Sequence, residues 1–147
     1  MPTYTCTTTA GRLSEEQRLK IVESITAMHS EETGAPRYLV QVLFYEVDAH
    51  AHYIGGKKAP EEQIWIRGDI RSGRTEVVKR NMLGRIVRDV AAATGSPEEY
   101  VWVYLCDLPA FHVIEYGQVM CPPGEEDAWF ATLSNKLKEV LQSATRL

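Results

Sequence analysis

The chain has 147 residues, of which 24% are charged, and a formal net charge of −4 at pH 7. This length suits one compact domain with a substantial hydrophobic core. An acidic net charge argues against a nucleic-acid partner, because nonspecific binding of nucleic acid needs a basic face. The sequence has neither a leader pattern nor an apolar stretch of membrane-spanning length, so we expect a cytoplasmic protein with no membrane partner.

The chain begins with Met1-Pro2. Initiator methionine is normally removed before a small residue such as proline, and its removal would leave Pro2 with a secondary amine. That amine acts as a general base when neutral and as a general acid when protonated, so its pKa decides its role. Residues 3–8 are rich in β-branched and aromatic side chains and predict a strand, which places the amine at a strand end. Met-Pro alone also fits an ordinary soluble chain.

The first half of the chain predicts a strand, a helix and a second strand. Ser14 and Gln17 have capping-box spacing, and the helix that follows is expected to end at Thr33-Gly34. Residues 38–44 then form an apolar run typical of a strand covered on both faces. The helix carries an apolar stripe made of Ile21, Ile25, Met28 and His29.

The second half repeats this order after a stretch, residues 46–62, that has no periodicity and predicts a loop. Residues 63–70 predict a strand, and Thr75 caps a helix expected to end at Thr94-Gly95. Residues 100–105 predict another strand covered on both faces. The two halves therefore form an internal repeat.

The repeat predicts an α+β fold. Two β-α-β units, residues 2–46 and 63–105, give a four-stranded sheet with both helices on one face. Residues 111–147 are expected to add a hairpin and a C-terminal helix capped by Ser134, so residues 1–147 form a single domain. The second face of the sheet would lie bare, and self-association is the simplest way to cover it.

Three residues are candidates for binding a substrate. His29 is on the apolar stripe, where a histidine is either a packed core residue or a functional group. Arg71 and Arg74 follow the strand at 63–70 and precede the Thr75 cap, and two guanidinium groups beside a helix N-terminus suit a small carboxylate. A solvated turn with two surface arginines is the alternative.

Tyr104 and Glu115 are further candidates. Tyr104 lies in a predicted buried strand, where most tyrosines only pack. Glu115 has apolar neighbours, and burial would raise its pKa unless a cation pairs with it. A metal site is not favoured, because His50 and His52 lack a third ligand, and because Cys6, Cys106 and Cys121 lack metal-ligand spacing and indicate free thiols.

Together these residues resemble the tautomerase superfamily, specifically its cis-3-chloroacrylic acid dehalogenase group. The resemblance runs from Pro2 to about Phe130 and rests on the order and spacing of the candidate residues and of the stretches 38–42, 70–75, 101–104, 115–117, 123–125 and 129–130. It departs from the group's dehalogenase at Gln118 and Ala35, where that enzyme has arginine and threonine. Both departures concern substrate preference more than machinery.

The resemblance implies a homotrimer whose active sites use Pro2, His29, Arg71, Arg74, Tyr104 and Glu115. In the implied chemistry the arginines, with His29, hold an unsaturated carboxylic acid, Tyr104 and Glu115 activate water, and Pro2 donates a proton. Such a hydratase or dehalogenase needs no metal or organic cofactor. The alternatives are a ketoenol tautomerase or decarboxylase that uses Pro2 as a base, and a non-catalytic, cytokine-like trimer.

Overall fold

The computed structural model describes residues 2–144. Met1 and residues 145–147, which belong to the predicted domain and its last segment, lie outside the described residues. The two predicted β-α-β units are present, and they are made of β1 (Thr3–Thr9), α1 (Glu15–Thr33), β2 (Gln41–Val47), β5 (Ile64–Arg71), α2 (Glu76–Thr94) and β6 (Val101–Leu108).

Both long helices begin and end where the sequence predicts. The Ser14 side chain accepts a hydrogen bond from the Gln17 backbone N–H, and the Gln17 side chain accepts one from the Ser14 N–H, which completes the capping box. Thr75 caps α2 through the Val78 N–H. Each helix ends at a glycine in the left-handed region, where an L side chain would be strained.

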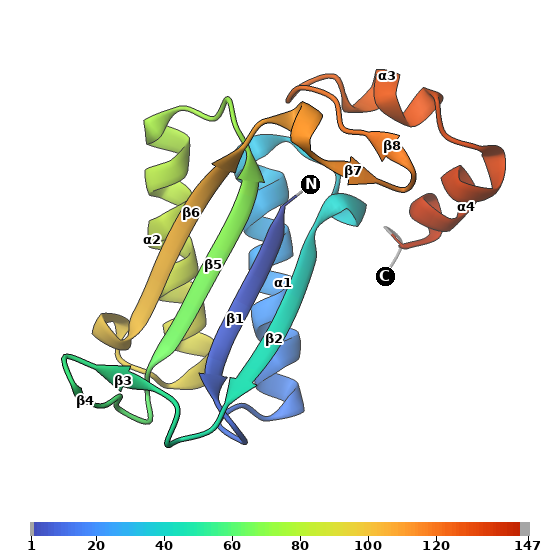
Figure 1. Cartoon of the computed structure of the whole chain (residues 1–147). Helices are drawn as coiled ribbons and strands as arrows, with labels where there is room; N and C mark the ends of the chain where they lie inside the picture. Colours follow the sequence, from blue (N-terminus) through green and yellow to red (C-terminus); the bar gives the residue numbers. More distant parts are fainter. Residues whose placement is uncertain (1, 145–147) are drawn as a thin grey trace.

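The sheet has the strand order β2-β1-β5-β6. Strand β1 runs parallel to β2 and antiparallel to β5, and β5 runs parallel to β6. Each unit is therefore a parallel pair joined through its helix, and the two units meet at the antiparallel β1–β5 pair. Figure 1 shows α1 and α2 side by side on one face of this sheet, which confirms the predicted α+β architecture.

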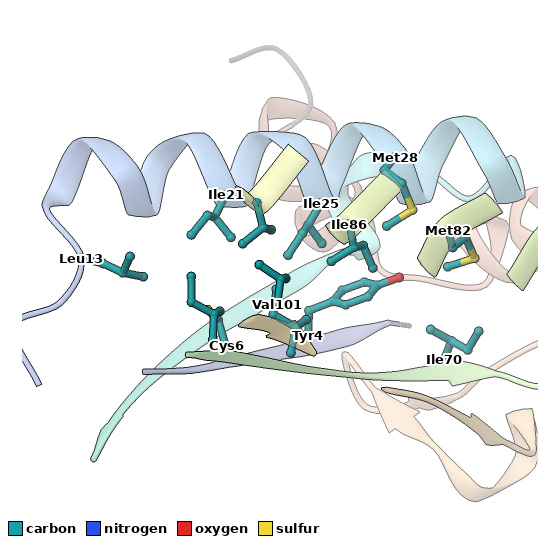
Figure 2. Close-up of a cluster of buried hydrophobic side chains, with 13 residues drawn as sticks. Tyr4, Cys6, Leu13, Ile21, Ile25, Met28, Ile70, Met82, Ile86 and Val101 are labelled. Atoms are coloured by element: carbon teal, nitrogen blue, oxygen red, sulfur yellow. The ribbon is translucent and has the colours of Figure 1, made fainter. Parts of the chain in front are cut away.

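The hydrophobic core lies between this face and the two helices. Alternate residues of β1 and β5 point into it, and the buried stripes of α1 and α2 close it from the other side. Figure 2 shows the Tyr4 ring lying in this core, beneath α1 and close to the side chains of Ile86 and Met82.

The opposite face of the sheet is open in the protomer. The runs at 38–44 and 100–105 form the edge strands β2 and β6, which the helices cover on one face only, so the second face lies bare in the protomer as predicted. Each run also begins with a short 3₁₀ turn, Arg37–Leu39 and Glu98–Tyr100. The open face carries the large exposed side chains Leu43, Tyr45, Trp102 and Tyr104.

Two short hairpins extend from opposite ends of the sheet (Figure 1). The hairpin of β7 (Ile114–Glu115) and β8 (Gln118–Val119) was predicted, whereas the one formed by β3 (Tyr53–Ile54) and β4 (Lys57–Lys58) falls in a stretch predicted to be a loop. Gly55-Gly56 is the signal that would have located it, because both residues have positive φ, as a two-residue hairpin turn requires.

The C-terminal segment continues from a 3₁₀ turn (Ala110–His112) and the β7–β8 hairpin into α3 (Glu126–Ala131) and α4 (Asn135–Ala144). Of these helices only α4 was predicted. A second buried cluster holds the segment against the start of β2 and consists of Leu39, Met120, Trp129, Leu133 and Leu141. None of the helices described in residues 2–144 is both long and apolar enough to cross a membrane.

Candidate active site

Pro2 lies at the start of β1, which is one of the two central strands of the sheet. The residue is buried, and its carbonyl accepts a hydrogen bond from the Gln41 N–H at 3.0 Å. Because Thr3 pairs with Asp69, Pro2 lies beside the end of β5, from which the Arg71–Arg74 turn departs. The structure therefore brings the predicted amine and the predicted arginine turn to the same end of the sheet.

Next to Pro2, the core contains a buried pair formed by Tyr4 and His29. The Tyr4 hydroxyl is 2.7 Å from His29 Nδ1, and both side chains are at most 2% exposed. The Tyr4 ring lies across Gly68, where an added Cβ would be 2.6 Å from Tyr4 Cε1, so only glycine fits at that position.

The protonation of this pair follows from its surroundings. Burial, reinforced by the charges of Arg74 and Arg71, lowers the pKa of His29 to about 3. Burial raises the pKa of Tyr4. Both groups are therefore neutral at pH 7, and the contact takes one of two forms: the Tyr4 O–H donates to Nδ1 and the histidine proton resides on Nε2, or Nδ1–H donates to the Tyr4 oxygen. His29 is thus a neutral hydrogen-bond donor rather than a cation.

Arg74 is the more available of the two arginines. It is half-buried, and its Nε and Nη1 have no hydrogen-bond partner among the residues described. Burial and the neighbouring Arg71 charge lower its pKa. The Arg74 charge acts on both His29 and Tyr4, so the guanidinium lies close to this pair. A guanidinium with buried, unpaired donors is a suitable ligand for an anion.

Arg71 is held by the C-terminal segment instead. Its side chain is buried, Nη1 donates to the Cys121 carbonyl at 2.7 Å, and Nη2 pairs with the Glu126 carboxylate. No sequence pattern singles out Glu126, since a glutamate after Pro123-Gly124 also fits an ordinary helix start. Tyr4 was missed as well, although Tyr4 and Cys6 alternate with threonines in the predicted strand, which indicates that both point toward the core.

Glu115 reaches this end of the sheet on the β7–β8 hairpin. The hairpin turns at Tyr116-Gly117, both with positive φ, and the Tyr116 hydroxyl donates to the Tyr38 carbonyl at 3.4 Å. Burial raises the pKa of Glu115 although the nearby Arg71 charge opposes the rise. Gln118, one of the two positions that depart from the resemblance, pairs with Glu115 across the hairpin, so it lies beside the candidate base.

Tyr104 is not brought to Pro2 within one protomer. It lies on β6, where it is 51% exposed on the open face. Its register partner on β5 is Arg67, which in turn is opposite Thr5 on β1. Two strand spacings and three residues of strand separate its backbone from that of Pro2, which amounts to about 14 Å. Its ring contacts Trp65, with the ring centroids 5.7 Å apart.

Comparison with known proteins places this arrangement in a family. Residues 1–135 match the family described as "Putative oxalocrotonate tautomerase enzyme". The crystal structure of N1, a member of the cis-3-chloroacrylic acid dehalogenase (cis-CaaD) family, superposes with a TM-score of 0.93 and 41% identity, covering 96% of this chain and 99% of that one. A "Probable tautomerase" of Bacillus cereus is 36% identical over 62 residues, which cover 42% of this chain and 100% of the relative.

More distant structures share the fold alone. One is a fused 4-OT wild-type asymmetric trimer with 23% identity and a TM-score of 0.74, which covers 80% of this chain and 94% of that one. The family match, which covers most of the chain, and the similarity to N1 agree with the duplicated β-α-β units. The chain therefore belongs to the tautomerase superfamily, in its cis-3-chloroacrylic acid dehalogenase-like group.

Proposed function

We propose that the protein adds water to a small unsaturated carboxylic acid that carries a halogen or an acetylenic bond at its β-carbon. The observation that carries this proposal is the half-buried Glu115 carboxyl at the same end of the sheet as Pro2 and Arg74. A carboxyl whose pKa burial raises is a better base near neutral pH than an exposed one. A hydratase needs such a base to generate its nucleophile.

The substrate's carboxylate would bind at Arg74, with the Nε2–H of His29 as a second donor. These groups withdraw electrons through the carboxylate and make the β-carbon electrophilic. We propose that Arg71 holds the C-terminal segment next to the site, since most of its donors bind that segment. The support for Arg74 is its pair of buried, unpartnered nitrogens.

In the proposed reaction Glu115 is the base and Pro2 is the acid. Glu115 accepts a proton from water, the resulting hydroxide adds to the β-carbon, and the Pro2 ammonium gives a proton to the α-carbon. With a halogen on the β-carbon the product is a halohydrin, which loses hydrogen halide to give malonate semialdehyde. Pro2 must carry a free amine for this role, so the intact mass of the purified protein should lack Met1.

Tyr104 would reach the site from a neighbouring protomer. In one protomer it is too far from Pro2, yet it lies exposed among the apolar side chains of the open sheet face. A head-to-tail ring of copies would bury that face, and we propose that it brings Tyr104 of one copy toward Glu115 of the next. We therefore propose a homotrimer, which the trimeric fused 4-OT neighbour also supports.

A ketoenol tautomerase is the second candidate. The positive charge of Arg74 near Pro2 would lower the amine's pKa and favour a base, and the Bacillus relatives bear the name "Probable tautomerase". Steady-state assays of the purified protein on cis- and trans-3-chloroacrylate, an acetylenic acid and phenylenolpyruvate separate the candidates. Chloride release with formation of malonate semialdehyde supports hydration, whereas turnover of phenylenolpyruvate alone supports the tautomerase.

A further inference from the structure

A second cavity lies at the end of the sheet where β1 finishes. Its volume is about 550 Å³, and it is bounded by the turn that follows Thr9 and by residues of the segment between β2 and β5. Figure 1 shows this end of β1 and the β3–β4 hairpin at the opposite end of the sheet from the N-terminus. The strand between Pro2 and Thr9 spans about 23 Å, so this cavity is separate from the candidate active site.

Arg12 lines this cavity and is held there by neutral groups. Its Nε donates to the Glu61 carbonyl at 3.2 Å, and its Nη2 donates to the Ser96 hydroxyl at 2.8 Å. The Ser96 hydroxyl in turn donates to the Glu62 carbonyl at 2.9 Å. Arg12 forms no ion pair with the described residues. The guanidinium is therefore fixed in position while its charge stays uncompensated.

Lys58 and His52 also line the cavity. Lys58 lies on β4, is exposed, and has no ion pair within residues 2–144. His52 is fixed at the base of the hairpin, because its carbonyl accepts a hydrogen bond from the Ala59 N–H at 3.0 Å. Its Nδ1 is buried and has no hydrogen-bond partner among the described residues, although buried polar atoms are normally paired. In the tautomer with the proton on Nδ1, this nitrogen is a donor for an anion.

The negative groups around the cavity leave an excess of positive charge. Of the described side chains that line it, only that of Glu61 is a carboxylate, against the two cations Arg12 and Lys58. The neighbouring Glu46 carboxylate is already paired, since it accepts from Arg18 at 2.6 Å and from the Gly11 N–H at 3.1 Å. The cavity therefore suits an anion.

We propose that this cavity is a second ligand site, which binds the phosphate group of a small phosphate monoester. Such a group carries about two negative charges near neutral pH and three acceptor oxygens, which match the two cations and the His52 nitrogen. The volume exceeds that of a phosphate alone, so the ligand has an organic body as well. That body is compact and polar, because the rest of the lining is mostly short: Thr9, Ala10, Gly11, Ala49 and Ala59.

The test uses ribose 5-phosphate as the probe and ribose as its uncharged counterpart. Calorimetry at pH 8 and constant ionic strength gives the dissociation constants. The wild type should bind ribose 5-phosphate and should not bind ribose. Lys58→Gln and Arg12→Gln should each weaken binding of the phosphate about tenfold. Lys57→Gln is the matched control, since Lys57 is the preceding residue, is exposed and does not line the cavity. It should match the wild type.

Arg74→Ala shows which cationic site the phosphate occupies, and it should bind ribose 5-phosphate as the wild type does. Three results overturn the inference: a wild-type dissociation constant weaker than about 1 mM, equal weakening in Lys57→Gln and Lys58→Gln, or a loss confined to Arg74→Ala. If Arg12→Gln does not fold, the two lysine variants of the exposed hairpin decide. Since binding is measured without turnover and away from Pro2, the outcome is independent of whether the protein hydrates haloacrylates.

Discussion

The hydroxyl of Tyr4 and Nδ1 of His29 form a buried hydrogen bond of 2.7 Å that joins the first strand to the first helix. Because both groups are neutral, the direction of this bond decides which ring nitrogen of His29 carries the proton. We propose that the Tyr4 O–H is the donor, which leaves the proton on Nε2, where it can be donated to a substrate. A contact deep in the fold thereby sets the chemistry of a site residue.

Removing the Tyr4 hydroxyl should release His29 from this tautomer. In Tyr4→Phe we expect the unfolding free energy to fall by about 1–3 kcal/mol, the cost of an unmade buried hydrogen bond, and kcat/KM to fall about tenfold. Imidazole ¹⁵N shifts report the tautomer directly. Tyr53→Phe, at an exposed hairpin position, serves as the control and should match the wild type. An unchanged His29 tautomer in Tyr4→Phe would show that the hydrogen bond does not set it.

His29 should also make the fold sensitive to acid. Its pKa is about 3 in the folded protein, lowered first by burial and then by Arg74, against about 6.5 in an unfolded chain. Between these values the unfolded state binds more protons, so stability should fall as the pH drops from about 6.5 toward 3. The slope is at most about 1.4 kcal/mol per pH unit for one group.

Urea denaturation at several pH values across this window measures that slope. His29→Gln should remove this component, whereas His112→Gln, which alters an exposed histidine, should retain it. The same slope in the wild type and in His29→Gln would mean that other groups account for acid sensitivity.

Much of the fold could be predicted because local signals agreed with the packing. Both helices begin at a capping residue, Ser14 or Thr75, and end at a left-handed glycine, Gly34 or Gly95. The equal spacing of these signals revealed the repeat. The edge strands β2 and β6 are covered on one face only within one protomer, and what covers their second face stays a prediction, since apolar composition alone does not say what covers a face. The short helix α3 gave no periodic signal because it has only 6 residues.

The candidate site divides in the same way. Residue types and local patterns were enough to name Pro2, His29, Arg74 and Glu115. In the structure these residues lie near the end of the sheet where β1 begins. The partners of these residues could not be named. The pairs Tyr4–His29 and Arg71–Glu126 join residues 25 and 55 positions apart in the chain, so no local spacing reports them.

The unequal surroundings of the arginines predict different effects of removing them. Arg74→Ala should lower kcat/KM by about one to two orders of magnitude, the cost of a charge-assisted contact, and should change stability little. Arg71→Ala should lower the unfolding free energy by about 3–5 kcal/mol, because it leaves the buried Glu126 carboxylate without its cation. Thermal denaturation and steady-state kinetics on both variants separate the two effects. Arg88→Ala, at an exposed position of α2, is the control.

Equal stability losses in Arg71→Ala and Arg74→Ala would refute this division of roles. So would an Arg74→Ala variant that turns over amide and acid forms of the substrate as the wild type does.

The proposed sharing of Tyr104 between protomers predicts complementation. Tyr104→Phe and Glu115→Gln should each be strongly impaired alone. When equal amounts are unfolded together and refolded as mixed trimers, a site is intact only if one copy supplies Glu115 and its neighbour supplies Tyr104. Random assembly in a head-to-tail ring makes this true for about a quarter of the sites. Activity equal to the average of the separate variants would place both residues in one protomer.

Hydration itself is tested most directly by measuring two reactions on Glu115→Gln. The amide keeps the shape of the side chain but cannot accept a proton from water, whereas a tautomerase moves a proton through Pro2 and needs no activated water. With Glu125→Gln as the control, we predict that hydration of cis-3-chloroacrylate falls by about 10² to 10⁴, while any phenylenolpyruvate tautomerisation is largely retained. Equal losses in both reactions, or a loss confined to tautomerisation, would contradict the assignment of Glu115 as the base that activates water.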